Sequence, residues 1–213
     1  MKITVLGGGG DVGSRIVTEA IERQHEVIAI SRKTTSLKHL PTQVEKLALE
    51  ITRTECIASA AKGSDLIISA LRPIDGKEQL LADITEMALN ASALLKLPII
   101  IVGGAARLKM PDQNSFTVLT MPNFLPETVK AIAHACQIQF ELCQNHRTAS
   151  WKYISPPAML LPGKRTGHYR RGKDTLLIDA DGNSTISMED FAVAILDEAE
   201  MPTPQTQAFT VAY

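Results

Sequence analysis

A cluster of glycines near the start of the chain has the spacing of a phosphate-binding loop. The segment GGGGDVG matches the pattern GxxGxxG when it starts at Gly7, and GxGxxG when it starts at Gly8. Gly10 and Gly13 belong to both patterns. Without Cβ atoms the backbone can turn tightly and approach a diphosphate, whose charge meets free N–H groups and the positive end of a following helix. The cluster therefore predicts a dinucleotide-binding loop, provided that a strand precedes it and a helix follows.

The residues on either side of the glycines supply that context. The apolar run Ile3 to Leu6 ends directly before them, and Val12, Ile16 and Ala20 follow at helical spacing. We predict a strand, a phosphate loop and a helix, with Asp11 and Val12 among the cofactor contacts. The carboxylate of Asp11 is expected to point away from the phosphates, because like charges repel. A glycine turn that holds no ligand is the alternative.

A basic turn after the second apolar run bears on which dinucleotide is bound. The run Glu26 to Ile30 leads into Ser31, Arg32 and Lys33. An acidic residue here would bond the adenine ribose of NAD, whereas cations accept the 2′-phosphate of NADP. We predict NADPH, with NADH as second choice: Arg32 pairs with the phosphate, Ser31 donates a hydrogen bond and Lys33 adds positive field. A solvated basic turn is the alternative.

Composition and charge exclude several classes of function. The chain has 213 residues, 45% hydrophobic and 21% charged, values typical of a soluble globular protein of one domain. Lys and Arg number 22 against 23 Asp and Glu, so the formal net charge is −1 at pH 7. This balance provides no long-range attraction for nucleic acid or an anionic membrane, and we expect neither as a partner.

No segment has the pattern of a secretory leader or a membrane span. The first apolar run is short and stops at glycines, and the richest later stretch, Met87 to Val102, is interrupted by polar residues and a proline. The cysteines Cys56, Cys136 and Cys143 lack the spacing of a metal site or a disulfide framework, so we expect free thiols and no metal. The expected location is the cytoplasm.

Short apolar runs and helical periods alternate through most of the chain. The predicted strands are Ile3 to Leu6, Val27 to Ile30, Leu47 to Leu49, Leu66 to Ala70, Ile99 to Val102 and Trp151 to Ile154. Helices are expected around residues 12–21, 55–62, 80–94 and 127–144, and after Ser187, which forms a capping box with Asp190. Strict alternation implies right-handed βαβ units, hence an α/β doubly wound parallel sheet, the Rossmann fold, in one domain over residues 1–213. A last strand, Phe209 to Ala212, is expected at an edge.

Two segments, residues 103–126 and 155–174, interrupt this alternation with prolines, glycines and asparagines. Each follows the carboxyl end of a predicted strand, where open α/β sheets bind ligands, so we assign both to the rim of the active cleft. In the second segment, Arg165, His168 and Tyr169 stand among further cations. They are candidates for holding an anionic substrate such as the phosphate of FMN, and a solvated loop is the alternative.

With these motifs the chain resembles the atypical short-chain dehydrogenase/reductases. The resemblance is closest to their NmrA-like branch, which holds bacterial NADH-flavin reductases and the biliverdin-B/flavin reductase type. The first loop has the GxxGxxG form of that branch, and the segments Asp65 to Leu71 and Trp151 to Pro157 are similar to its later strands. Residues 190–192 resemble its late helix. The resemblance implies NAD(P)H-dependent reduction on a Rossmann fold.

The resemblance also implies contacts beyond the glycine loop. Glu50 and Ile51 stand where the family has an Asp-Val pair that contacts adenine. The further positions that it places along the cofactor or the substrate are Ala70, Leu71, Gly103, Gly104, Pro156 and Pro157. Arg72, just past the fourth predicted strand, is a candidate contact to a phosphate or the substrate, and a surface cation is the alternative. Biliverdin-B reductase has a histidine after its Pro-Pro pair, where this chain has Ala158, which favours flavins or quinones over biliverdin.

The catalytic pair of the superfamily is missing from its usual place. Most members carry Tyr-x-x-x-Lys on the helix before the sixth strand, and residues 127–144 contain no tyrosine. Tyr169 and Lys173 match the pattern but lie after the sixth strand between glycines, and we interpret the match as coincidental. A flavin accepts hydride and can draw its remaining proton from solvent, so a site that only stacks a planar ring needs no such acid. We assign no catalytic residue.

Three hypotheses follow, in order of preference. The first is an NADPH-dependent reductase of a small-molecule flavin or quinone-like acceptor, with FMN or FAD as substrate rather than prosthetic group, acting as a monomer or homodimer. The second is a non-catalytic NADP-binding sensor of the NmrA type, which the missing tyrosine favours equally. The third, an epimerase or dehydratase of nucleotide sugars, is weaker because it needs the absent acid/base pair.

Overall fold

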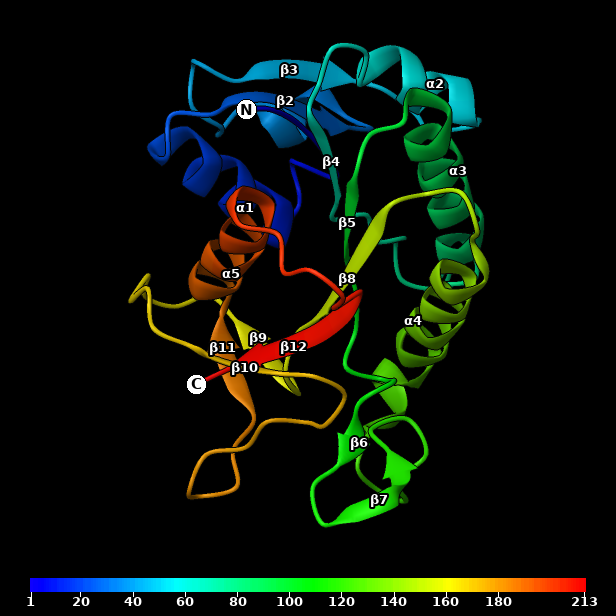
Figure 1. Ribbon diagram of the computed structural model, residues 1–213, viewed down its shortest axis with the longest axis vertical. Helices are drawn as coiled ribbons and strands as arrows, with labels where there is room; N and C mark the ends of the chain where they lie inside the picture. Colours follow the sequence, from blue (N-terminus) through cyan, green and yellow to red (C-terminus); the bar gives the residue numbers. More distant parts are fainter.

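An eight-stranded, mostly parallel sheet forms the centre of the molecule, in the order β10-β12-β8-β5-β4-β1-β2-β3 (Figure 1). The computed structural model describes residues 1–213, apart from the side chain of Asn114. The strands are β1 (Lys2–Leu6), β2 (Glu26–Ser31), β3 (Glu45–Ala48), β4 (Leu66–Ser69), β5 (Ile99–Val102), β8 (Trp151–Ser155), β10 (Arg170–Gly172) and β12 (Ala208–Ala212). Neighbouring strands run parallel except for the antiparallel pair β10 and β12. The predicted doubly wound α/β fold is confirmed.

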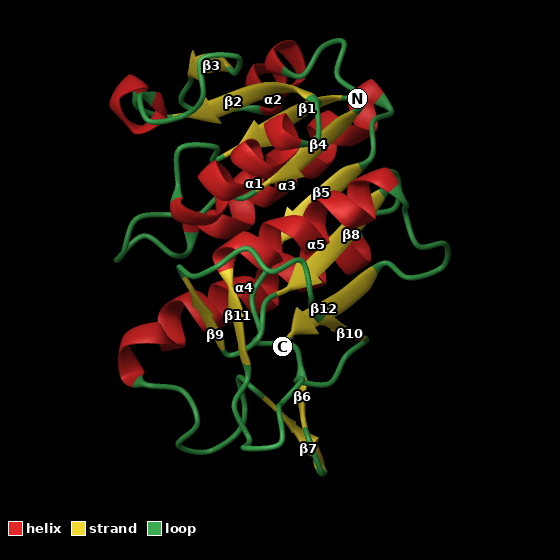
Figure 2. Cartoon of the chain, turned by 90° about the vertical axis from the view of Figure 1, so that its left-hand side faces the viewer, coloured by secondary structure: helices red, strands yellow, loops and turns green.

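Helices cover both faces of this sheet. The helices α1 (Asp11–Glu22) and α5 (Met188–Glu200) pack on the face that Figure 2 turns toward the viewer. On the opposite face lie α2 (Thr54–Ala60), α3 (Leu80–Leu95) and α4 (Glu127–Asn145) (Figure 1). Adjacent strand residues therefore point into different cores: Ile68 into the core under α1 and α5, and Ile67 into the core under α2 and α3. None of the described helices combines the length and the apolar character needed to cross a bilayer.

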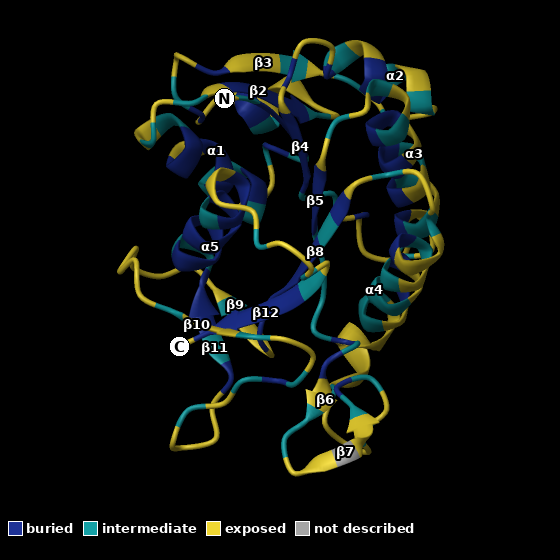
Figure 3. Ribbon diagram, in the orientation of Figure 1, coloured by how far each residue is buried: buried dark blue, intermediate teal, exposed yellow. Residues whose placement is uncertain are grey.

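Burial explains why the strands are continuous apolar runs. With helices on both faces, neither side of a central strand meets water, so alternation of polar and apolar residues is lost. Figure 3 shows the central strands buried and most of the exposed residues in the connecting segments. These exposed connections at the carboxyl ends of the strands are where the chain has freedom to build a site.

The first and last helices begin in different ways. At α5 the Ser187 hydroxyl accepts a hydrogen bond from the N–H of Asp190 at 2.9 Å, which confirms Ser187 as the N-cap. The reciprocal bond of the predicted capping box does not form, because the Ser187 N–H donates to the Tyr213 hydroxyl and the Asp190 carboxylate accepts from Thr166 and Gly167. At α1 the residue before the first turn is Gly10, which has no side chain to cap the helix. The N–H groups of that turn are thus left without a side-chain cap, as a phosphate-binding helix requires.

The edge of the sheet differs from the prediction. β12 was expected at an edge, but it lies between β8 and β10. The reason is that the second rim segment folds back and adds β10 antiparallel to β12, so the rim itself covers the edge. The first rim forms a small antiparallel pair, β6 (Lys109–Met110) with β7 (Gln113–Thr117). In the second rim β9 (Met159–Leu161) pairs in parallel with β11 (Thr185–Ser187), which directly precedes α5. Elsewhere, the short 3₁₀ helix η1 (Thr34–Leu37) follows β2.

Candidate functional site

The glycine loop between β1 and α1 is held by close backbone contacts. Gly7 has a φ of +79°, and a Cβ there would lie 2.4 Å from the carbonyl oxygen of Ala70. A Cβ on Gly13 would lie 2.1 Å from the carbonyl oxygen of Gly7. Gly10 differs, because its nearest neighbour, the Gly7 oxygen, would stand 3.3 Å from the added carbon. The fold therefore requires the outer glycines, whereas the missing side chain of Gly10 leaves space beside the helix N-terminus.

The two middle glycines have different roles. A Cβ on Gly8 would lie 2.9 Å from the Cβ of Ala29, so Gly8 allows the loop to pack on β2 and does not line the cleft. A Cβ on Gly9 would lie 2.7 Å from the Cβ of Ser36 on η1. Gly9, which the two patterns treat as variable, thus lets the loop pass beneath η1, and it does line the cleft.

A cleft of about 670 Å³ runs from the glycine loop across the carboxyl ends of the strands. The predicted site residues that line it are Gly7, Gly10, Asp11, Val12, Ser31, Arg32, Ala70, Leu71, Arg72, Gly103, Gly104, Pro156 and Pro157. The predicted residues that do not line it are Gly8, Gly13, Lys33, Glu50, Ile51, Arg165, His168 and Tyr169. We call the part lined by residues 7–36 and 70–73 the cofactor half, and the part lined by residues 102–161 the acceptor half.

Ser31, Arg32 and Ser36 meet the glycine loop at one end of the cofactor half. Arg32 is exposed, and among the described side chains it is engaged in no ion pair. Ser36 was not predicted as a site residue. The signal for it is the run of hydroxyl side chains, Thr34 to Ser36, that directly follows the basic turn. Lys33, which was predicted to add positive field there, is exposed, directly precedes η1 with extended backbone and does not line the cleft.

Glu50 and Ile51 lie outside the cleft, contrary to the expected adenine contact. Glu50 is exposed to solvent, and Ile51 packs against the core under α2 and α3. The segment after β3 turns toward α2, and this apolar packing draws Ile51 inward instead of along the cleft.

The acceptor half is built mostly from apolar side chains and backbone. Its walls include Val118, Leu125, Val129, Ile132 and Leu160. Within the described lining of the whole cleft, the charged side chains are Asp11, Arg32 and Arg72, all from the cofactor half. The acceptor half therefore offers dispersion contacts to an apolar ring and no ionic partner to a substrate.

Tyr153 on β8 lies directly behind the acceptor half. A Cβ on Gly103 would lie 2.0 Å from a ring carbon of Tyr153, which explains glycine at that position. The Tyr153 hydroxyl accepts a hydrogen bond from the Gly104 N–H at 3.1 Å and lies 3.2 Å from Oε1 of Gln139. Burial raises the pKa of Tyr153 well above its ordinary value, so the phenol stays protonated. Tyr153 shapes the wall and does not line the cleft.

Cys136 on α4 is the thiol that faces the acceptor half. Burial raises its pKa to about 11, so it is a neutral group at physiological pH. A Cβ on Gly104 would lie 2.7 Å from its sulfur, so the thiol packs against the glycine backbone. All three cysteines are free, as predicted.

The second rim segment divides at residue 162. Residues 156–161 line the cleft, whereas the following residues run over α1 and α5. There Arg165 donates to both oxygens of Glu19 on α1, at 2.6 and 2.8 Å, and the Tyr169 hydroxyl donates to Asp197 on α5 at 2.6 Å. His168 is exposed. None of the three residues lines the cleft, and two of them are engaged elsewhere, Arg165 by the buried Glu19 and Tyr169 by the partly exposed Asp197.

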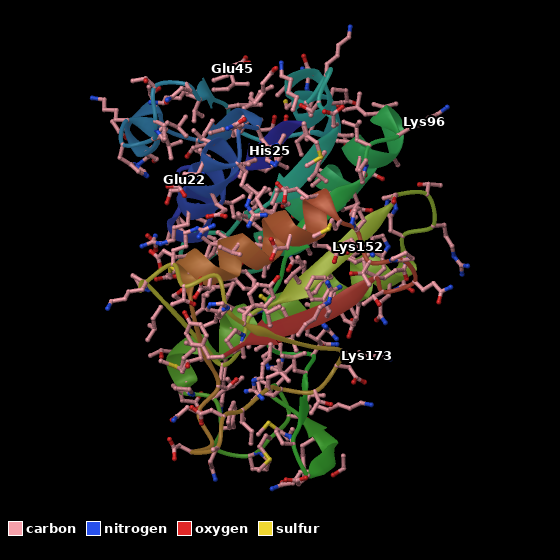
Figure 4. All side chains as sticks on the ribbon, turned by 60° about the vertical axis from the view of Figure 1, so that its left-hand side comes forward. Glu22, His25, Glu45, Lys96, Lys152 and Lys173 are labelled. Carbon is pink, nitrogen blue, oxygen red and sulfur yellow. The ribbon has the colours of Figure 1, made fainter. Side chains whose placement is uncertain are left out.

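Tyr169 and Lys173 do not form a catalytic pair at the cleft. Burial and the hydrogen bond to Asp197 raise the pKa of Tyr169 above its ordinary value. Lys173 follows β10, the outermost strand of the sheet (Figure 4). Neither residue lines the cleft, in keeping with the interpretation of the match as coincidental.

The Rossmann fold with an uncapped, glycine-lined helix N-terminus at the carboxyl ends of the strands defines a dinucleotide-binding protein. A family model described as NAD(P)H-binding matches residues 7–202, and the chain belongs to this family. This match agrees with the resemblance to the atypical short-chain dehydrogenase/reductases and confirms the expected NAD(P)H-binding family. The space at Gly10 and the free N–H groups of α1 fit the diphosphate of such a cofactor.

Comparison with individual proteins agrees with this assignment. Protein YwnB of Bacillus subtilis (strain 168) is 32% identical over 99% of this chain and 98% of its own. The crystal structure of a "putative epimerase" from Bacteroides thetaiotaomicron is 29% identical and has a TM-score of 0.90, covering 100% of this chain and 96% of that one. The structure of a "putative NADH-flavin reductase" from Streptococcus pneumoniae TIGR4 is 24% identical, with a TM-score of 0.85 over 100% and 99% of the two chains, and shares the fold.

Proposed function

We propose that the protein is an NADPH-dependent oxidoreductase that reduces a planar acceptor ring, either a quinone or the isoalloxazine of FMN or FAD. The observation that carries this proposal is the single cleft that joins the glycine loop to an apolar half without charged side chains among its described residues. When bound, the reduced nicotinamide supplies a hydride, which together with one proton from water reduces a quinone to its hydroquinone and leaves NADP⁺.

The residues of the chain would act by binding and positioning. The glycine loop and the N–H groups of α1 hold the diphosphate, and Arg32 with Ser31 and Ser36 receives the 2′-phosphate. The apolar walls of the acceptor half stack the ring and exclude water, which brings the reacting groups together.

Proton supply from solvent is consistent with the chemistry of the walls. In the acceptor half, as far as its side chains are described, the titratable group is the thiol of Cys136, whose raised pKa of about 11 makes it a poor acid. A ketone reductase needs an acid beside the developing alkoxide, whereas a quinone or flavin can be protonated after hydride transfer. The composition of the acceptor half therefore favours the second class of substrate.

Nicotinamide absorbance would test the proposal. Purified protein is mixed with NADPH or NADH and with a water-soluble benzoquinone, FMN or FAD, and oxidation is followed against protein-free mixtures. We expect turnover with NADPH well above the background for at least one acceptor. Tight NADPH binding without turnover across the panel would overturn the reductase and favour the NADP-binding sensor. Equal affinity for NADH and NADPH would contradict the assignment of the cofactor.

A further inference from the structure

A second hollow of about 420 Å³ lies beside the acceptor half. Apolar side chains dominate its lining, which includes Met110, Phe124, Leu176 and Ile178. Ala158 and Met159 line this hollow and the cleft alike, so the two spaces are neighbours across one short ridge of chain. The contributing strands, β6, β9 and β11, lie in the lower half of the molecule in Figure 1.

The wall between the two spaces has its own small core. Leu108, Val118 and Leu176 are buried together in it. Val118 faces the cleft and Leu176 faces the second hollow, so one cluster supports both surfaces. A shape carried by a packed core of this kind is present before any ligand arrives, which lowers the entropic cost of binding there.

The ridge between the two spaces, Ala158 and Met159, is held by backbone hydrogen bonds and carries small or flexible side chains. The N–H of Ala158 donates to the hydroxyl of Ser184 at 3.2 Å, and the N–H of Met159 donates to the Ser184 carbonyl at 2.9 Å. Ala158 contributes a single methyl group, and Met159 keeps half of its surface exposed. A ligand that starts in the acceptor half can therefore continue over a methyl group and a flexible thioether.

The charge of the second hollow selects among ligands. In the part of its lining that the structure describes, the charged residue is Asp112, which is negative. A ribityl phosphate, the extension that FMN carries, would meet this carboxylate and no cation, because Arg165 is engaged with Glu19. An uncharged apolar chain meets methyl, thioether and aromatic groups instead.

We propose that the second hollow is a subsite for an apolar tail, and that the acceptor is a quinone whose ring binds in the acceptor half and whose short prenyl tail crosses Ala158 and Met159. This inference rests on the proposed function, which it sharpens by naming one acceptor class. It predicts that the affinity for the quinone rises with the number of prenyl units, because each unit that enters the second hollow removes apolar surface from water.

Calorimetric titration of NADP⁺-saturated protein tests the subsite without turnover. The ligands are 2,3-dimethoxy-5-methyl-1,4-benzoquinone and the same ring with one and with two prenyl units. We expect the first unit to tighten binding by about tenfold. Equal dissociation constants along the series would overturn the subsite. Tail-dependent binding without oxidation of NADPH in a parallel assay would overturn the reductase and leave the subsite standing.

Two charge variants distinguish binding of the prenyl tail in the second hollow from nonspecific hydrophobic binding elsewhere on the protein. Ile178→Asp places a charge in the second hollow at a residue that is 37% exposed, and Leu94→Asp places the same charge on α3 at 63% exposure, outside both spaces. We expect the tail to add no more than twofold in affinity in Ile178→Asp and its full effect in Leu94→Asp. Retained NADP⁺ affinity shows that a variant is folded. If Ile178→Asp does not fold, Phe124→Asp places the charge in the same hollow and replaces it in the experiment. An unchanged tail effect in the folded variants of this hollow would refute the proposal.

Discussion

The two halves of the cleft are built on different principles. In the cofactor half the backbone itself is the site, and Gly7 and Gly13 pack so closely that an added Cβ would come within 2.4 Å of a carbonyl oxygen. In the acceptor half the backbone carries apolar side chains that come from β5, α4, β9 and the first rim. Gly7 and Gly13 leave no room for a side chain, while the acceptor half depends on the summed shape of many side chains.

The difference follows from what each half would hold. A diphosphate needs N–H groups at fixed positions, and only backbone close to the ligand can present several at once. A flat apolar ring needs contact area, which many combinations of Val, Leu, Ile and Met can supply at similar volume. We therefore expect substitutions in the cofactor half to have large and specific effects, and those in the acceptor half to have graded ones.

The largest effect should come from adding a methyl group to the glycine loop. Gly13→Ala would force the Cβ to within 2.1 Å of the Gly7 oxygen unless the backbone moves, and we expect a loss of roughly 3 kcal/mol or more in the free energy of unfolding. Gly10→Ala meets its nearest atom at 3.3 Å, so stability should change by less than about 1 kcal/mol. Chemical denaturation measures both values.

Gly10→Ala should affect cofactor binding more than it affects stability. Gly10→Ala keeps the fold but fills the space beside the first turn of α1, and we expect about tenfold weaker NADPH binding or more. If Gly10→Ala bound NADPH as tightly as the unchanged protein, the diphosphate would have to lie elsewhere, and the special role of the cofactor half would be lost.

The next effect concerns the choice between the two dinucleotides. Arg32→Asp should weaken NADPH binding by about 1.5–3 kcal/mol, which is the usual value of a hydrogen bond to a charged group, and should affect NADH much less. Lys33→Asp is a matched control, because it makes the same change one residue along but outside the cleft. Titrations of both cofactors against both variants decide the matter. Similar losses for the two cofactors, or for the two variants, would contradict the placement of the 2′-phosphate.

Sequence patterns anticipated the cofactor half much better than the acceptor half, for a physical reason. The glycine loop is contiguous, and its steric demands appear directly as residue types at Gly7, Gly10 and Gly13. The acceptor half joins residues such as Val118, Ile132 and Leu160, which only the folded chain brings together. No spacing rule links them, and each looks like ordinary core in the sequence.

The differences between expectation and structure share one cause, because each concerns how a loop packs. Ile51 packs against the core under α2 and α3, Arg165 pairs with Glu19 on α1, and the second rim segment forms β10 beside β12. In each instance a residue type was interpreted by its position after a strand, and tertiary packing or a charge partner far away in the sequence decided its direction. Burial of Glu19, 146 residues away from Arg165, was not visible in the local pattern.

A charge in the acceptor half should have an intermediate effect. Ile132→Asp places a carboxylate on the wall where a neutral ring would bind, and we expect KM for a quinone to rise by about tenfold while NADPH affinity changes little. Ile138→Asp lies on the same helix at 49% exposure, away from the cleft, and should leave KM unchanged. Steady-state kinetics with both variants measure this. If Ile132→Asp changed NADPH affinity as much as KM, the division into two halves would not hold.

The smallest effect concerns Arg165, which the sequence assigned to the substrate and the structure assigns to Glu19. Arg165→Met should leave KM for the acceptor unchanged and lower the free energy of unfolding by about 1 kcal/mol, a modest value because the Arg165 side chain is 49% exposed and Arg23 also pairs with Glu19. Kinetics and denaturation at neutral pH give both numbers. A raised KM for FMN would restore the phosphate-binding hypothesis.

The pH dependence of this variant identifies the partner of Arg165. Burial alone would raise the pKa of Glu19, but hydrogen bonds from Arg165 and Arg23 outweigh it and hold the pKa below its ordinary value. Because the folded pKa lies below the unfolded one, the pair contributes its full stability above the ordinary pKa of a glutamate and loses it as the pH falls through the lowered pKa of the folded state. The stability difference between the unchanged protein and Arg165→Met should therefore shrink toward zero in acid. A difference that persisted to low pH would mean that Arg165 acts through packing of its aliphatic stem and not through the carboxylate.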